Sequence, residues 1–317
     1  QSHGIVLSFQ QSTFDNFDAS NLKDSKCTQF YWKDDPYISG ILGKNTFRYR
    51  ELDLLGHYTK METAIEHILP LKKLLINKLC LSNDPVESKK SVSEFIKTNS
   101  SKWEEFIENN HEENSLYKFY QNSVRYISFT KNKGTRKVYE APAMWAHYGQ
   151  KHKGVCLVFD KKLLKKLIKR QFPPSNLKGL SVSYNLHCSE LKQIEKNEHE
   201  RHAEFFLRNA KDVLFKKNRD WREESEYRYV VISNDSSNNG NGLCFLENIN
   251  QALIAVVLGI EFNENYKCAI INLLKGSHIR VYQLYFKNGK FVLSLVNTDE
   301  LIGSPEDILQ YCLIDEL

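Results

Sequence analysis

The sequence predicts an α+β protein with a mixed or antiparallel central sheet and flanking helices. Two apolar runs, 154–160 and 252–258, are short and rich in β-branched residues, as expected for strands that are buried on both faces. The segments 279–286 and 290–295 flank Asn288-Gly289, a dipeptide typical of hairpin turns. Helical segments lie between these strands at uneven spacing, which favours an α+β order over a doubly wound parallel sheet.

The other elements follow from periodicity and from residues that break it. Apolar residues at helical spacing predict a helix over 61–75 that is broken at Pro70. Leu79-Cys80-Leu81 is predicted to be a short buried strand that ends at Ser82, and 124–130 a longer one. Further helices are expected at 144–150, 161–170, 197–217 and 263–274, and loops at 131–138 and 233–242.

The domain organisation is predicted from changes in composition along the chain. Residues 1–45 lack helical period and are expected to form an N-terminal extension. A single domain over 46–300 follows, with a polar helical insert at about 86–122. Residues 301–317 form a C-terminal tail.

Composition narrows the classes of protein to consider. The chain has 317 residues and a net charge of +5, from 44 Lys+Arg against 39 Asp+Glu, which permits an acidic or nucleic-acid partner without requiring one. Its seven cysteines are dispersed, with no CxxC pair, so we expect reduced thiols, a cytoplasmic location and no zinc site. No apolar run is as long as a membrane span, and we expect no membrane association.

The segment 221–232 is the most informative stretch of the chain. It begins Trp-Arg-Glu-Glu-Ser-Glu and continues with aromatic and β-branched residues typical of a strand. Side chains alternate across a strand, so Glu224, Glu226 and Arg228 are predicted to share one face, while Ser225, Tyr227 and Tyr229 take the other. Two carboxylates and a guanidinium on one face are costly to bury unless they pair or bind a ligand. A solvated edge strand with a cross-strand ion pair is the simpler alternative.

Several other short motifs combine residues that can bind or react. His57-Tyr58-Thr59 precedes the broken helix, and Met144 to Gly149 places a Trp, a His and a Tyr within four positions. These supply stacking faces and titratable groups, although a turn and a core helix explain them equally well. The chain has no phosphate-binding loop, dinucleotide fingerprint, GxSxG elbow or HExxH motif.

In order, these motifs resemble a bacterial family known as domain of unknown function 2971. The resemblance covers about residues 55–295. Its motifs in this chain are His57-Tyr58-Thr59, Ser82, Asn83-Asp84-Pro85-Val86-Glu87, Ser128-Phe129-Thr130, Met144 to Tyr148, Gly154-Val155, Trp221 to Arg228 and Val257-Leu258-Gly259. One departure is that Ser82 directly precedes Asn83, where the family pattern has several residues between them.

The same order is also similar to the three-part signature of ADP-ribosyltransferases. That resemblance implies an ADP-ribosyltransferase-like core and NAD as substrate. His57 would hold the NAD ribose, Ser82 would shape the nicotinamide pocket, and Glu226 or Glu224 would lie beside the reacting ribose carbon. Arg228 would pair with a glutamate or grip a phosphate. Further NAD contacts are expected from Tyr58, Thr59, Asn83, Asp84, Ser128, Trp145 and Tyr148, with Tyr58, Trp145 or Tyr148 stacking on a ring of NAD.

The residue types suit that chemistry. Cleavage of the nicotinamide–ribose bond develops oxocarbenium character, which a fixed carboxylate stabilises. A second carboxylate can orient or deprotonate the acceptor. The resemblance therefore implies ADP-ribose transfer to a macromolecule, protein or nucleic acid, or hydrolysis of NAD, in a toxin or anti-phage effector that needs no metal.

Two other functions remain open at this point. A metal-independent nuclease or RNA-processing enzyme would use His57, His147 and the carboxylates, and its activity would not respond to NAD. A non-catalytic module would bind a nucleotide or a protein near Trp145 and Tyr148, and a ligand would stabilise it without turnover.

Overall fold

The computed structural model describes residues 53–84, 87, 118–186, 201–232 and 242–296, with the backbone alone of 49–51, 185–186 and 311–313. Two compact units are present. The smaller comprises 1–52 with 293–317, and there β1 (Tyr49–Glu51) pairs antiparallel with β14 (Tyr311–Leu313). The larger, 53–292, contains the sheet and helices described below.

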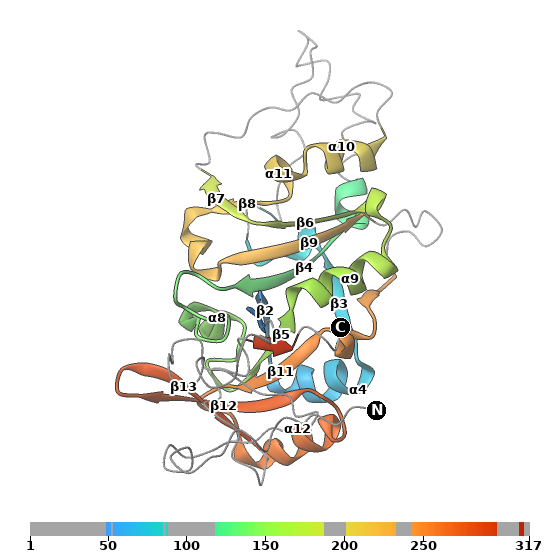
Figure 1. Cartoon of the computed structure of the whole chain (residues 1–317). Coiled ribbons are helices and arrows are strands. Elements are labelled where there is room, and N and C mark those ends of the chain that lie inside the picture. The colour runs from blue at the N-terminus through green and yellow to red at the C-terminus, as the bar shows by residue number, and fades with distance from the viewer. Residues whose placement is uncertain are drawn as a thin grey trace, which may run out of the picture. The chain divides into compact units, whose positions relative to one another are not determined.

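A ten-stranded mixed sheet organises the larger unit and confirms the predicted α+β class (Figure 1). Most neighbouring strands are antiparallel, and β11 and β12 form a parallel pair. One path through the sheet runs β10 (Cys244–Leu246), β3 (Leu74–Lys78), β4 (Val124–Lys131), β2 (Leu54–Thr59), β5 (Val155–Asp160), β11 (Leu253–Leu258), β12 (Arg280–Lys287) and β13 (Lys290–Leu295), while β9 (Glu226–Ile232) joins β4 to β6 (Leu177–Ser181).

Strand β4 is the point where the sheet divides. One of its edges pairs with β9 along almost its whole length, from Val124↔Ile232 to Thr130↔Glu226. Its other edge is shared between β3, which pairs at residues 125–126, and β2, which pairs at residues 130–131. In the described strand pairs, residues 127–129 have no partner strand on that second edge. On that edge the carbonyl of Ser128 bonds to a side chain, that of His57.

The helices lie largely where the sequence predicts them. Predicted helices 161–170 and 263–274 correspond to α9 (Lys161–Gln171) and to η9 with α12 (Glu264–Leu274), and the one at 144–150 to the shorter α8 (Pro142–His147). The break at Pro70 takes the form of a π-helical turn over Ala64–Ile68 directly before the proline. Since proline donates no backbone hydrogen bond, the preceding turn is the place where such widening occurs.

Three predicted elements are wrong. Leu79–Leu81 forms a 3-10 turn, because Lys72 adopts a left-handed conformation that ends the preceding helix early and places the strand at Leu74–Lys78. The predicted helix at 197–217 is, in its described part, two short helices, α10 (His202–Arg208) and α11 (Ala210–Val213), followed by β8 (Lys216–Asn218). Asn209 interrupts the helix with its side chain donating to the carbonyl of Phe205, and β8 pairs with β7 (Ser183–Leu186).

The third correction concerns Glu224, which does not lie on the acidic strand. It ends a 3-10 helix, η6 (Arg219–Glu224), and Ser225 turns the chain in a left-handed conformation before β9 begins at Glu226. The carboxylate of Glu224 therefore reaches the site from a turn and not from alternation along a strand.

The remaining predicted segments are a hairpin, which the structure describes, and three segments that lie wholly or mostly outside the described residues. The hairpin at 288–289 is confirmed, since Asn288 and Gly289 both have positive φ as its turn requires. The extension 1–45 and the loop at 233–241 lie outside the described residues. Of the predicted insert 86–122, the structure describes residue 87 and residues 118–122, all of them helical.

A tight backbone contact at Gly154 provides a test of this fold. A Cβ there would lie 2.3 Å from the carbonyl oxygen of Thr59 on the neighbouring strand, so Gly154→Ala should lower the free energy of unfolding by about 1–3 kcal/mol. Denaturant unfolding measures the change. Gly242→Ala is the matched control, because no atom of the described part of the chain lies within 4 Å of the added Cβ, and an equal loss in both variants would contradict the strand packing.

Candidate functional site: a buried cluster of three glutamates

The site is centred on Arg228, which is fully buried on β9. Its Nε donates to Glu226 Oε1 at 2.6 Å, and its Nη1 donates to Glu87 Oε1 at 2.6 Å and to the carbonyl of Leu214 at 2.8 Å. Its Nη2 reaches both carboxylates as well, at 3.0 and 3.2 Å. Of the two roles predicted for Arg228, the structure shows the pairing with a glutamate, here with two of them, and the contact with a phosphate stays a prediction.

Lys217 joins the third glutamate to this group. Its ammonium lies 2.7 Å from Glu224 Oε2 and 2.9 Å from Glu226 Oε2. Burial alone would lower the pKa of Lys217, but the attraction of Glu226, Glu87 and Glu224 raises it, so the lysine is charged. We call Glu87, Glu224, Glu226, Lys217 and Arg228 the acidic cluster; its three carboxylates outnumber its two cations by one.

The two glutamates that share Lys217 differ in acidity. Burial alone would raise the pKa of Glu226, but Arg228 and Lys217, aided by hydrogen bonds from Arg228 and Ser128, lower it to about 2. Burial raises the pKa of Glu224, and Lys217 offsets this in part. Glu226 is thus ionised throughout the physiological range, while Glu224 takes up a proton more readily.

Strand β4 holds Glu226 from the opposite side. Register pairs Ser128 with Arg228 and Thr130 with Glu226, so these four side chains share one face of the sheet. The hydroxyl of Ser128 donates to Glu226 Oε1, and the backbone N–H of Glu226 donates to the hydroxyl of Tyr184 at 2.7 Å. The predicted sharing of a face by Glu226 and Arg228 is confirmed. Tyr227 and Tyr229 form a ring pair, with their centroids 5.3 Å apart, from the other face.

His57 occupies the dividing point of the sheet. Its Nδ1 lies 2.9 Å from the carbonyl oxygen of Ser128, and because a carbonyl only accepts, Nδ1 carries the proton. Burial lowers the pKa of His57, and the hydrogen bond to Ser128 offsets this in part, so the ring is neutral near pH 7 and Nε2 keeps a lone pair. The residue retains partial exposure. The imidazole thus bonds to the backbone of Ser128, whereas the hydroxyl of Ser128 bonds to Glu226. Register pairs Gly56 with Thr130 and Thr130 with Glu226, so the next residue, His57, lies on the opposite face of the sheet, with its ring 5.7 Å from that of Phe129. The structure therefore does not bring the His57 side chain to the acidic cluster.

Ser82 reaches the cluster through a different partner from the one expected. Its hydroxyl donates to Glu87 Oε2 at 2.6 Å and accepts the backbone N–H of Asp84 at 3.3 Å. Ser128, not Ser82, is thus the serine that holds Glu226. Asp84 is buried beside Ser82, whereas Asn83 is exposed.

The predicted aromatic contacts divide into two groups. Tyr148 is partly exposed and its hydroxyl donates to Glu224 Oε1 at 2.7 Å, so it belongs to the site. Tyr58 and Trp145 are buried and pack edge to face at 4.9 Å, with the Tyr58 hydroxyl donating to Val138 and the indole N–H to Tyr139. Neither ring offers a face to a ligand, so their predicted stacking on NAD is wrong. Thr59 is buried at the end of β2.

Lys217 and Glu87 were missed as site residues. The sequence places Glu87 in a motif whose simpler interpretation is a helix start, and Lys217 within a predicted helix. The signal that could have found them is charge balance, because three buried carboxylates need cations beyond Arg228. Within the described residues, no three or more His, Cys, Asp or Glu side chains are arranged so that they could hold a metal ion, and no helix is long and apolar enough to cross a membrane.

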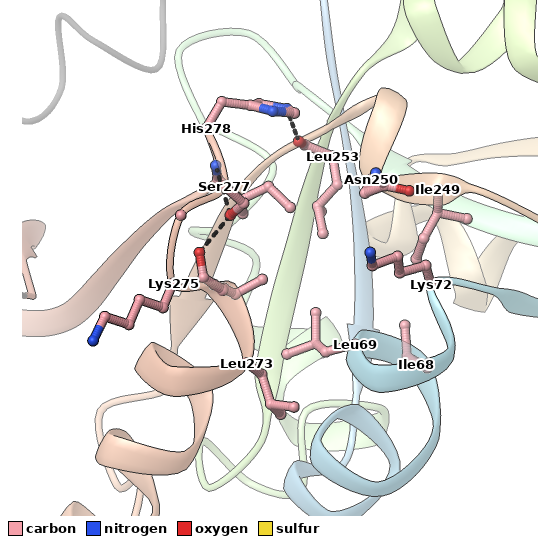
Figure 2. A pocket seen from close by; sticks show the side chains of 13 residues that line it. Ile68, Leu69, Lys72, Ile249, Asn250, Leu253, Leu273, Lys275, Ser277 and His278 are labelled. Carbon is pink, nitrogen blue, oxygen red and sulfur yellow. Dashed lines mark hydrogen bonds between the residues drawn. The ribbon is translucent and has the colours of Figure 1, made fainter.

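A pocket of about 360 Å³ lies elsewhere, between α4 (Leu69–Leu71), the 3-10 turn at Ile249–Gln251 and the end of α12 (Figure 2). None of the predicted site residues lines it. Two of its polar side chains bond to backbone carbonyls of the protein: Ser277 donates to the carbonyl of Leu274 at 2.6 Å, and His278 Nε2 donates to that of Leu253 at 3.1 Å. In Figure 2, Lys72 reaches inward and Lys275 points away. This pocket is separate from the acidic cluster.

Residues 144–229 match the model of the family described as protein of unknown function (DUF2971). The DUF2971 segment runs from α8 to β9 and so includes Tyr148, Lys217, Glu224, Glu226 and Arg228. This supports the family resemblance over that segment, while the motifs before 144 and after 229 stay predictions. No curated protein and no solved structure matches the chain.

A pair of substitutions on β4 tests whether Ser128 holds Glu226. Ser128→Ala removes a hydrogen bond to an ionised carboxylate and should lower the free energy of unfolding by about 1.5–3 kcal/mol. Thr130→Val is the control on the same face, because the Thr130 hydroxyl is buried without a hydrogen-bond partner among the described residues and its removal should be close to neutral. Equal losses by chemical denaturation would argue against the described contact.

Proposed function

We propose that this protein is an enzyme of the ADP-ribosyltransferase type, which cleaves the nicotinamide–ribose bond of NAD and transfers ADP-ribose to a macromolecule or to water. One observation carries the proposal: two glutamates share one lysine, yet their pKa values are shifted in opposite directions. Pairs of carboxyl groups whose environments separate their pKa values are typical of sites that need one fixed charge and one group that exchanges protons.

Glu226 has the properties of the fixed charge. Bond cleavage sends the electron pair of the C–N bond to nicotinamide and leaves positive charge on the ribose carbon. A carboxylate that Arg228, Lys217 and Ser128 hold in place needs little reorganisation to stabilise that charge. The excess of one carboxylate in the acidic cluster leaves net negative charge for this purpose, although both cations lie close by.

Glu224 has the properties of the group that exchanges protons. As the acceptor oxygen forms its bond to the ribose carbon, its proton would pass to Glu224. The carboxyl lies at the end of a turn beside the partly exposed Tyr148, which places it nearer to solvent and an incoming acceptor than Arg228 is.

His57 suits the binding of a ribose hydroxyl. With Nδ1 donating to Ser128, its Nε2 lone pair can accept a hydrogen bond from a hydroxyl group. Register places the imidazole on the face of the sheet opposite Glu226, so a hydroxyl bound by His57 would belong to a part of the ligand away from that carboxylate. Ser128, rather than Ser82, is the serine that contacts the proposed catalytic glutamate.

Nicotinamide release from NAD is the direct test. Purified protein, with and without a cell extract as a source of acceptor, should release nicotinamide, and Glu226→Gln should reduce the rate by about 100-fold or more. Glu223→Gln is the matched control one position away from Glu224, because Glu223 pairs with Lys133 and Arg136 outside the acidic cluster. Circular dichroism checks that both variants fold. No release in any extract, or equal rates in the two variants, would rule out the proposal.

The pH dependence of the rate separates the two glutamates. If Glu224 must be ionised to accept a proton, activity falls as the pH drops through its raised pKa, above the usual 4.5. Glu226, with a pKa of about 2, stays ionised there and does not limit the rate. The rate with a macromolecular acceptor should therefore lose its acid limb in Glu224→Gln. If the rate of this variant still falls at low pH as in the wild type, a group other than Glu224 accepts the proton.

A further inference from the structure

Helix α9 carries a positive charge as large as the net charge of the whole chain. Its eleven residues include five lysines and Arg170, with no aspartate or glutamate. The helix thus contributes +6 to a chain whose net charge is +5, so the other residues together carry −1. Charge this uneven indicates a localised electrostatic surface rather than a generally basic protein.

Four of the lysines form a continuous stripe. Lys162, Lys165, Lys166 and Lys169 stand at positions i, i+3, i+4 and i+7, which lie on one face of a helix, and all four are exposed. We call these four residues the lysine stripe. The opposite face carries the buried side chains of Leu164, Leu167 and Ile168. The helix is thus anchored by its apolar face, and Figure 1 shows it beside the sheet.

The lysine stripe lacks compensating acids. Among the described residues, none of its four ammonium groups forms an ion pair or a hydrogen bond, whereas Lys161 at the start of the helix pairs with Asp53 at 2.6 Å. Like charges at i,i+3 and i,i+4 repel each other and destabilise a helix. A polyanion laid along the stripe would remove that repulsion.

We propose that the lysine stripe of α9 binds the phosphate backbone of a nucleic acid. Lysines act as point charges that neutralise phosphates without reading bases, so the binding is independent of sequence. A membrane surface is disfavoured, because the exposed side of the helix carries no aromatic or aliphatic residue to insert among lipids. The regular spacing of the lysines suits an anion whose charges also repeat regularly. Binding at the lysine stripe does not depend on NAD chemistry.

Salt-dependent binding tests the proposal. Fluorescence anisotropy with labelled oligo-U RNA, oligo-dT DNA and a DNA duplex is measured between 50 and 200 mM NaCl. Replacing all four stripe lysines by glutamine should reduce the slope of log K against log salt by about 3 for a single strand, since each lost phosphate contact removes about 0.7. The fold should survive, because glutamine and lysine have similar helix propensities and the change removes repulsion.

A charge-matched control distinguishes the stripe from net charge. Glutamine at Lys60, Lys153, Lys275 and Lys290 removes the same four charges from exposed, scattered positions and should leave the slope within about 1 of the wild type. Two pairwise variants, Lys162→Gln with Lys166→Gln and Lys165→Gln with Lys169→Gln, should each remove about half of the effect and serve if the quadruple variant does not fold.

Several outcomes would overturn the proposal. They are absence of binding to all three probes, equal loss in the stripe and control variants, and stripe-dependent binding to phosphatidylserine vesicles or polyglutamate that matches or exceeds binding to the oligonucleotides. Because the assay contains no NAD, its result leaves the proposed enzymatic activity to be judged on nicotinamide release alone.

Discussion

The bond between buried Arg228 and two glutamates is the constraint on which this region of the protein depends. An unpaired guanidinium or carboxylate in the interior is strongly destabilising, so Glu87, Glu226 and Arg228 must come together when the chain folds. That requirement joins β9 to a segment far away in sequence. Lys217 then draws the turn that ends at Glu224 into the same group. Such a network is a costly way to stabilise a fold compared with apolar packing, which favours a functional reason for its presence.

Division of the sheet at β4 gives the cluster its chemical context. Because β2 leaves β4 after Gly56, the carbonyl of Ser128 has no strand partner in the described pairs and bonds to His57 instead. On the other face of the same strand, the hydroxyl of Ser128 holds the ionised Glu226, and Lys217 links Glu226 to the less acidic Glu224. Strands position Ser128, Glu226 and Arg228, and strands hold side chains more rigidly than loops do, whereas Glu224 comes from the end of a 3-10 helix.

The sequence was most informative where one physical effect dominates. The buried strands and the hairpin at Asn288-Gly289 follow from apolar runs and turn chemistry, and the sharing of one face by Glu226 and Arg228 follows from alternation. Sequence patterns gave wrong predictions for residues whose structure is set by contacts with distant segments of the chain. Lys217 lies in a strand because β7 pairs with Lys216 and Asn218 on either side of it, and Trp145 and Tyr58 are core residues because they pack against each other. The grouping of positions 57, 82 and 226 was predicted from the ADP-ribosyltransferase pattern. Ser82 reaches the acidic cluster through Glu87, but His57 lies on the other face of the sheet, because alternation along β2 follows the pairing of Gly56 with Thr130.

The central physical claim is that Glu224 and Glu226 differ in acidity although one lysine contacts both. Carbon-13 NMR of side-chain carboxyl groups in glutamate-labelled protein, with Glu224→Gln and Glu226→Gln used for assignment, measures this directly. The account predicts that Glu224 titrates above 4.5 and that Glu226 stays ionised until the pH approaches 2. Two signals that titrate together near the ordinary value for glutamate would contradict it.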